Sequence, residues 1–204
     1  MPPALSGLSR NFKFILVSGS PRRKELLQNL GLRFTVVKPG IEEKIRPAHY
    51  RQDIVRVARD KINSVPALSG QILIACDTLV ICAGKVLGKP KNSKQAAEFL
   101  RLLSGRKHTV LSCLAVKAVR QKKIYLWHKT TATKVWFRKI STAEIIKYVK
   151  TPVPYDKAGA YGIQDPRSLF VSRIKGCYYN VVGLPVSSLI DILTLIWKKE
   201  QNRK

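Results

Sequence analysis

The sequence predicts an α/β protein, and three features of the chain lead to that prediction. An apolar run at 14–17 passes through a short polar loop into a helical pattern at 24–30, which is the order strand, loop, helix. A continuous apolar run at 72–76 is typical of a central strand that is covered on both faces. Three strand-like segments between residues 109 and 137 predict an antiparallel meander.

The other elements follow from apolar spacing and from turn residues. Helical patterns predict helices at 52–63, 94–103, 142–149 and 186–197. Further strands are predicted at 34–37, 169–174 and 179–182. Serine hydroxyls are expected to cap the helices that follow Ser20, Ser93 and Ser141. We expect a partly disordered N-terminal extension at 1–13, a single α/β domain at 14–197, and a frayed basic tail at 198–204.

The charge of the chain is extreme. It has 204 residues, of which 45% are hydrophobic, so it can bury a real core, and its net charge is +26. Such a balance predicts attraction to polyanions, with nucleic acid as the first candidate and nucleotides as the second. The basic residues are spread along the whole chain and no nucleic-acid-binding signature accompanies them, so binding to nucleic acid is not expected.

Membrane and metal signals are weak. No apolar run approaches the length of a membrane span, and residues 1–13 contain no apolar core of a signal peptide. The four cysteines are scattered and form no Cys-x-x-Cys pair, so a zinc site is not expected. Cys76 and Cys113 lie in apolar strand-like runs and are expected to be buried thiols, which indicates a reducing cytoplasm.

The hexapeptide 18–23, Ser-Gly-Ser-Pro-Arg-Arg, is the first candidate site. The free N–H groups of a helix N-terminus and the guanidinium groups of Arg22 and Arg23 would face one point, which suits a phosphate-sized anion. The Gly-Lys-Ser/Thr ending of a Walker loop is absent. A capped helix with two solvated arginines explains the hexapeptide equally well.

Carboxylates are scarce, so each one can be inspected as an acid, a base or a metal ligand. Asp77 follows the apolar run 72–76 directly, and we expect it at the carboxyl end of that strand, where ligands gather in open α/β sheets. The alternative is a turn aspartate that caps local N–H groups. Two later loops, a cationic one at 88–90 and one rich in small residues at 155–164, are further candidates.

Taken together, these motifs resemble the Maf family of nucleoside triphosphate pyrophosphatases, also called septum-formation inhibitors. The resemblance covers the chain from Phe14 to about Leu195. It is carried by eight motifs in order: 18–23 (SGSPRR), 40–43 (GIEE), 58–61 (ARDK), 76–78 (CDT), 88–90 (GKP), 104–110 (SGRKHTV), 156–164 (DKAGAYGIQ) and 182–185 (VGLP).

The resemblance implies a curved mixed β-sheet flanked by helices, with two lobes around a deep nucleotide-binding cleft, often in a dimer. It also implies hydrolysis of a nucleoside triphosphate to the monophosphate and pyrophosphate, with Mg²⁺ or Mn²⁺ as cofactor. By this resemblance the metal lies on Glu43 and Asp77, and catalysis falls to Asp77, Glu43 and Lys89. Substrate binding falls to Ser18, Ser20, Arg22, Arg23, Lys61, Thr78, Lys157 and Gln164.

The motifs look most like the branch of the family that acts on dTTP and UTP. A branch that acts on methylated GTP is the alternative, and a nucleic-acid-binding or cell-division regulatory protein is the alternative outside the enzyme class. This chain departs from the family at 165–168, where Asp-Pro-Arg-Ser stands in place of glycine. Proline stiffens that loop, and the departure bears on base selectivity near Gln164.

Overall fold

The computed structural model describes residues 3–121 and 123–202. Its elements in chain order are α1 (Pro3–Asn11), β1 (Lys13–Val17), α2 (Pro21–Asn29), β2 (Phe34–Val37), η1 (Pro47–His49), α3 (Tyr50–Asn63), β3 (Gln71–Cys82), β4 (Lys85–Leu87), α4 (Ser93–Leu103), β5 (Lys107–Arg120), β6 (Lys123–Phe137), α5 (Thr142–Val149), η2 (Val153–Asp156), η3 (Ala158–Ala160), β7 (Val171–Lys175), α6 (Tyr178–Val182) and α7 (Val186–Gln201). None of these helices is long and apolar enough to cross a membrane.

The strands form one mixed sheet, which confirms the predicted α/β class. Their order is β2-β1-β3-β5-β6-β7, and β4 pairs with β3 outside this path. β1 is parallel to β2 and to β3, with Val17 opposite both Val37 and Ala75. β4 and β7 are antiparallel to their partners. The parallel pairing therefore ends just before Ser18 on β1 and just before Cys76 on β3.

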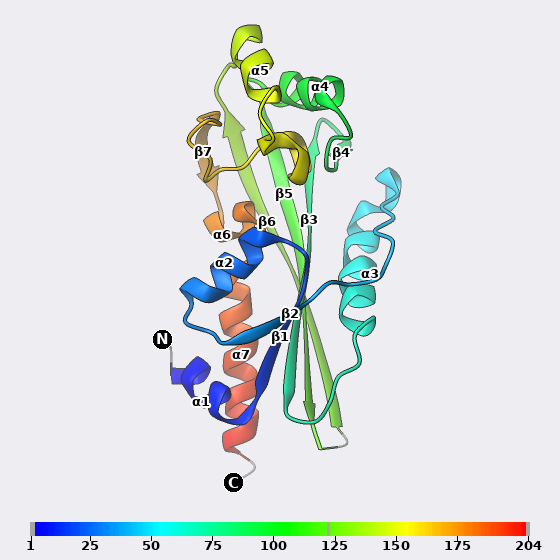
Figure 1. Ribbon diagram of the computed structural model, residues 1–204, viewed down its shortest axis with the longest axis vertical. Coiled ribbons are helices and arrows are strands. Elements are labelled where there is room, and N and C mark those ends of the chain that lie inside the picture. Colours follow the sequence, from blue (N-terminus) through cyan, green and yellow to red (C-terminus); the bar gives the residue numbers. More distant parts are fainter. Residues whose placement is uncertain (1–2, 122, 203–204) are drawn as a thin grey trace. The chain divides into compact units, whose positions relative to one another are not determined.

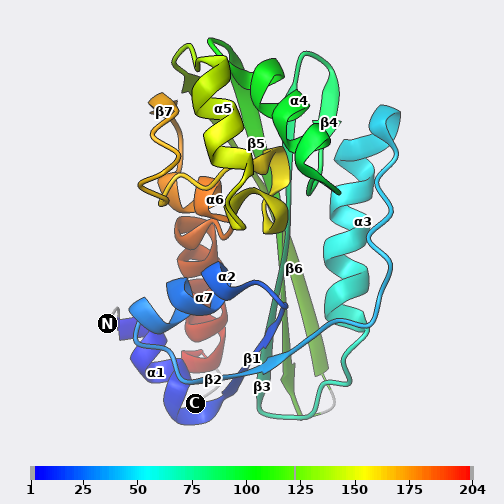
Figure 2. The same cartoon turned by 45° about the horizontal axis from the view of Figure 1, so that its top comes forward.

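The chain divides into two compact units. Unit 1 comprises Met1–Asp77, Cys113–Thr131 and Gly183–Lys204, and unit 2 comprises Thr78–Ser112 and Ala132–Val182. In unit 1, α3 and α7 lie on opposite sides of the strands (Figure 1). In unit 2, α4 and α5 pack side by side (Figure 2) and bury apolar side chains such as Leu100 and Ile145. The single domain and the cleft that the resemblance implies stay predictions.

Both ends of the described chain are more ordered than the sequence suggests. The segment expected to be partly disordered forms α1, because Leu5 and Leu8 lie on one helical face and are fully buried. This helix packs on α7, and Gly7 lies so near Trp197 that an added Cβ would collide with the indole. At the other end, α7 continues to Gln201 and does not fray at Lys198. Residues 1, 2, 203 and 204 lie outside the described residues.

Two of the expected strand ends are absent. β3 runs without interruption from Gln71 to Cys82, so the prediction that Asp77 ends a strand is wrong. The strand continues because its neighbours change: β1 pairs with β3 up to Ala75, and β4 pairs with it from Val80. Likewise, the two strands expected at 124–127 and 130–137 are one strand, β6.

Of three local predictions near the chain's turns, two are wrong and one is confirmed. The strand expected at 179–182 is the helix α6, because the buried Asn180 amide points inward and donates to the Val110 carbonyl and to Thr133 Oγ1. The cap of α4 is Asn92 and not Ser93, since the Asn92 side chain accepts from the Gln95 N–H. Ser141 caps α5 as predicted, in a capping box with Glu144.

Candidate functional site

The loop between β1 and α2 is closed by the Ser18 hydroxyl. Ser18 is buried, and its Oγ accepts a hydrogen bond from the Ser20 N–H at 3.2 Å. Pro21 occupies the first turn of α2, as predicted, but the Ser20 side chain makes no capping hydrogen bond. The predicted Ser20 cap is therefore wrong: the hydroxyl that accepts from a backbone N–H in this loop is that of Ser18. The positive end of α2 is nevertheless presented at this loop.

The Arg23 guanidinium is fixed in place at the same loop. Its Nε donates to the Gly183 carbonyl at 2.9 Å, and its Nη1 donates to Ser18 Oγ at 3.1 Å. Arg22 and Arg23 are both half-buried. A cation that is positioned by the protein before an anion arrives loses little conformational entropy when it binds, which favours recognition of phosphate oxygens.

A second polar group lies in unit 1 around the buried ammonium of Lys61. Lys61 is in the last turn of α3 and is 3% exposed. Its Nζ lies 2.6 Å from Asp77 Oδ1 and 2.8 Å from Glu43 Oε1. Asp77 is also buried, whereas the Glu43 side chain is half-exposed. The three residues come from α3, β3 and the loop after β2, so only the fold brings them together.

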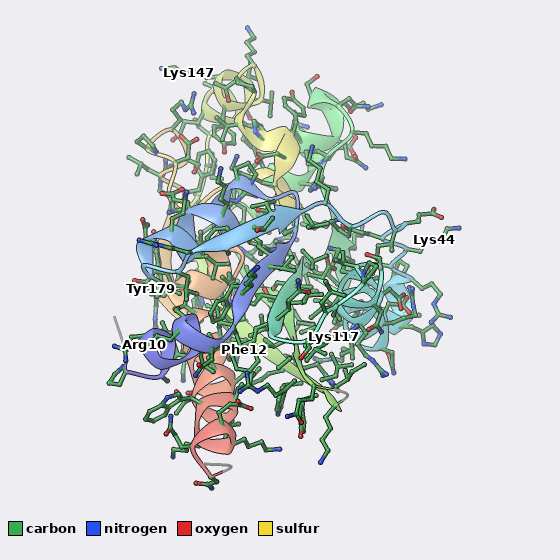
Figure 3. The ribbon with its side chains drawn as sticks, turned by 60° about the horizontal axis from the view of Figure 1, so that its bottom comes forward. Arg10, Phe12, Lys44, Lys117, Lys147 and Tyr179 are labelled. Atoms are coloured by element: carbon green, nitrogen blue, oxygen red, sulfur yellow. The ribbon has the colours of Figure 1, made fainter. Side chains whose placement is uncertain are left out.

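The loop that carries Glu43 is anchored to α3 by a second carboxylate, which the sequence analysis missed. Asp53 is buried and accepts from Arg46 Nε, Arg46 Nη2 and the Arg46 N–H at 2.7–3.0 Å. These hydrogen bonds hold the pKa of the Asp53 carboxyl well below its usual range. Arg56 Nη2 donates to the carbonyl of Lys44, whose side chain reaches away from the ribbon (Figure 3). An aspartate on the apolar face of a predicted helix is the signal that could have revealed this anchor.

The residues around Lys61 are suited to a hard divalent cation. Glu43 and Asp77 both contact the Lys61 ammonium, so their two carboxylates lie near each other. Among the described residues, no group of three or more His, Cys, Asp or Glu side chains could hold a metal. Because Mg²⁺ typically takes one or two protein carboxylates and completes its shell with phosphates and waters, two carboxylates are sufficient.

In unit 2, Thr78 is positioned by a serine that the sequence analysis missed. Thr78 Oγ1 lies 2.9 Å from Ser112 Oγ, and Ser112 is fully buried. The Ser112 hydroxyl lies inside the apolar run of β5, where a buried hydroxyl needs a polar partner. A serine in such a run is therefore the feature of the sequence that could have predicted this contact. The hydrogen bond restricts the direction in which the Thr78 hydroxyl points.

The other predicted residues of unit 2 lie on two loops that are hydrogen-bonded to each other. Lys89 is exposed in the loop after β4, and the preceding Gly88 carbonyl accepts from the Gly159 N–H at 3.0 Å. Lys157 Nζ donates to the Val153 carbonyl and to the Asp156 carboxylate. Gln164 is exposed at a turn. The structure thus brings the backbones of these loops together and gives Lys157 local partners.

His108 is a structural residue in the core of unit 2. Its Nε2 lies 2.8 Å from the Tyr161 hydroxyl, and its ring packs edge-on against Phe137. Burial lowers the pKa of His108 to about 4. Its Nδ1 is buried and has no hydrogen-bond partner among the described residues, so protonation would bury an unpaired N–H group.

The free energy of unfolding is expected to fall in acid because of His108. The unfolded chain binds a proton near pH 6.5, whereas the folded chain does so only near pH 4, so stability is lost as the pH falls through this range. The loss attributable to His108 is about 3 kcal/mol at pH 4. Urea unfolding at pH 7 and pH 4 measures it. His108→Gln should remove this part of the pH dependence, and His49→Gln, at an exposed position, should retain it.

The chain is similar over most of its length to proteins of one family. The sequence pattern of the Maf-like protein family matches residues 13–196. A protein of Alkaliphilus oremlandii named dTTP/UTP pyrophosphatase is 46% identical over 89% of this chain and 94% of its own. Proteins with the same name from Carboxydothermus hydrogenoformans and Salmonella typhimurium are 41% and 44% identical, over 87% and 88% of this chain and 95% and 90% of their own. The chain therefore belongs to the Maf-like protein family.

Solved structures of other proteins are more distant. A HAM1 protein from Coxiella burnetii is 16% identical, with a TM-score of 0.45 over 90% of this chain and 98% of its own. The Ham1 protein of Staphylococcus aureus is 10% identical, with a TM-score of 0.42 over 94% of this chain and 100% of its own.

Proposed function

We propose that this chain hydrolyses dTTP and UTP to the nucleoside monophosphate and pyrophosphate. The observation that carries the proposal is the Lys61 group, in which a buried lysine holds the carboxylates of Asp77 and Glu43 together. Membership of the Maf-like family and the shared name of the relatives support the reaction and the bases.

We assign the central proton transfer to Asp77. Its carboxylate accepts the proton of the attacking water, while Lys61 holds Oδ1 and so fixes the direction of the other oxygen. The oxygen of the water bonds to the α-phosphorus, and the bond from that phosphorus to the bridging oxygen breaks. The electron pair leaves with pyrophosphate.

The cations of the 18–23 loop bind the phosphates in this proposal. Arg23, fixed by Ser18 and Gly183, and Arg22 neutralise the charge that develops on the leaving pyrophosphate. Mg²⁺ or Mn²⁺, held by Glu43 and Asp77, would polarise the phosphate oxygens and lower the pKa of bound water.

For unit 2 we propose the roles that the family resemblance implies. Thr78 and Gln164 contact the base or the sugar, and Lys89 and Lys157 supply positive charge toward the phosphates. We also place the protein in the cytoplasm, since none of its four cysteines forms a disulfide and three of them are buried.

The proposed function is tested by a nucleotide panel. Purified protein is incubated with dTTP, UTP, CTP, ATP, GTP and methylated GTP, with Mg²⁺ or Mn²⁺ or with chelator, and pyrophosphate and orthophosphate are measured. Water labelled with ¹⁸O should place the label in the monophosphate, because the α-phosphorus is attacked. Preferred cleavage of methylated GTP would move the chain to the other branch. Release of orthophosphate, or no cleavage at all, would refute the proposal.

Arg22→Ala is expected to raise KM for UTP by about 10-fold or more, with a smaller effect on kcat, because it removes charge-assisted hydrogen bonds to phosphate. Steady-state kinetics at fixed ionic strength measures the change. The matched control is Arg33→Ala, which removes the same charge from an exposed position in unit 1. An equal rise of KM in both variants would mean that net charge, and not the loop, attracts the nucleotide.

A further inference from the structure

The Asp-Pro-Arg-Ser segment at 165–168 forms the second of two consecutive β-turns in unit 2. In the first turn, the Asp165 N–H donates to the Gly162 carbonyl at 3.0 Å, and Gln164 is one of the two central residues. In the second turn, the Ser168 N–H donates to the Asp165 carbonyl at 2.9 Å. Pro166 stands directly after the first residue of this turn, where its fixed φ is favourable.

Side chains of the second turn fasten it to the first. Ser168 is 2% exposed, and its hydroxyl lies within hydrogen-bonding distance of both the Gly162 carbonyl and the Asp165 carbonyl. The Asp165 carboxylate accepts from the Arg167 N–H and Nε at 2.9 Å each, and from Nη2 at 3.0 Å. The Gly162 carbonyl therefore accepts both a backbone and a side-chain hydrogen bond.

The chain that enters the first turn is equally constrained. The Tyr161 ring is buried, and its hydroxyl is bonded to His108. Gly162 packs against the stem of Lys157 so closely that an added Cβ would lie 2.7 Å from Lys157 Cε. Gln164 itself remains exposed. The turn is thus a rigid support that presents one amide to solvent.

The position of the Gln164 amide matters because its hydrogen-bonding groups alone do not distinguish uracil and thymine from guanine. An amide offers one donor group and one acceptor side by side. Uracil and thymine match this pair with O4 and N3–H, but guanine matches it equally with O6 and N1–H. The two kinds of base differ in how far that edge lies from the sugar. The edge lies nearer the sugar in uracil and thymine than in guanine. An amide held at one place can bind the pyrimidine edge and reject the guanine edge, whereas an amide on a loose turn can adjust to both.

We propose that Ser168 is a specificity-determining positioning residue, which fastens the turn that carries Gln164 and so favours uracil and thymine over guanine. The inference rests on the proposed function, in which Gln164 contacts the base or the sugar, and it takes the base as the group that Gln164 contacts. The hydrogen bonds of Asp165 and Ser168 restrict a backbone that glycine residues in this turn would leave free.

The test is the ratio of kcat/KM for UTP to that for GTP. Ser168→Ala removes the hydroxyl that bonds to Gly162, and we expect this ratio to fall by about 5- to 10-fold, the equivalent of one neutral hydrogen bond. Most of the change should lie in KM for UTP and in a gain with GTP. Amide hydrogen exchange at 162–165 should also become faster in the free protein.

Three further variants make the result specific. Asp165→Ala should lower the ratio in the same direction, and Asp165→Asn, which retains an acceptor for the Arg167 N–H, should restore most of it. Ser172→Ala is the control, because its exposed hydroxyl donates to the Trp136 carbonyl elsewhere in unit 2, and the ratio should not change. Thermal unfolding of each variant checks that it folds.

The outcomes separate the two proposals. If the wild-type protein cleaves UTP and the ratio is unchanged in both Ser168→Ala and Asp165→Ala, the positioning role is refuted and the proposed function stands. If the wild-type protein cleaves no nucleotide, the proposed function fails and the positioning role fails with it. An equal loss of kcat/KM for UTP and GTP would mean that the turn only supports the fold, which also refutes a role in specificity.

Discussion

Asp77→Asn is expected to lower kcat/KM for UTP by a factor of about 1,000, within the range for loss of a general base. The amide has nearly the shape of the carboxylate and still offers an oxygen to Lys61, but it cannot accept the proton of the attacking water. Lys61 also retains Glu43, so the fold should persist. Steady-state kinetics with UTP and dTTP measures the loss, and urea unfolding checks the fold.

The matched control for Asp77→Asn is Asp60→Asn. Asp60 lies in the same unit and pairs with Arg56 on the exposed side of α3, so the same chemical change should leave kcat/KM within about twofold. Activity of Asp77→Asn close to that of the wild type would exclude Asp77 as the base. A loss of kcat/KM of equal size in both variants would mean that removal of a negative charge, and not the position of Asp77, lowers the activity.

Lys61→Met is expected to lower the free energy of unfolding by about 3 to 5 kcal/mol, because it leaves the buried carboxylate of Asp77 without its cation. Methionine fills nearly the same volume, so the loss would reflect charge more than packing. The control is Lys44→Met, whose side chain is 74% exposed and pairs with Glu42. That change should stay within about 0.5 kcal/mol. Urea unfolding at neutral pH measures both.

A double substitution distinguishes an unpaired charge from a lost contact. When Asp77 is also replaced, as in Lys61→Met with Asp77→Leu, no unpaired buried carboxylate remains, and we expect part of the lost stability to return. If the double variant is as unstable as the sum of the two single variants, the ion pair is not the cause of the destabilisation.

Local patterns predicted those parts of the fold in which neighbouring residues decide the structure. The strand at 34–37 and the helix at 142–149 with its Ser141 cap have the predicted bounds, because apolar spacing and a capping box act within a few residues. The end of a strand is different. Asp77 interrupts an apolar run and resembles a strand end, yet β3 continues through it because other strands pair with β3 on both sides of Asp77, and Lys61 neutralises the buried carboxylate.

The same contrast holds for the candidate site. The α/β class, the strand–loop–helix order at 18–23 and the residue types that suit a phosphate all follow from the sequence. That Lys61 joins Glu43 to Asp77, and that Ser112 positions Thr78, follows only from the folded structure. Each of these contacts joins residues far apart in the chain. Their geometry depends on how helices and strands pack, and no local pattern of residues specifies that packing.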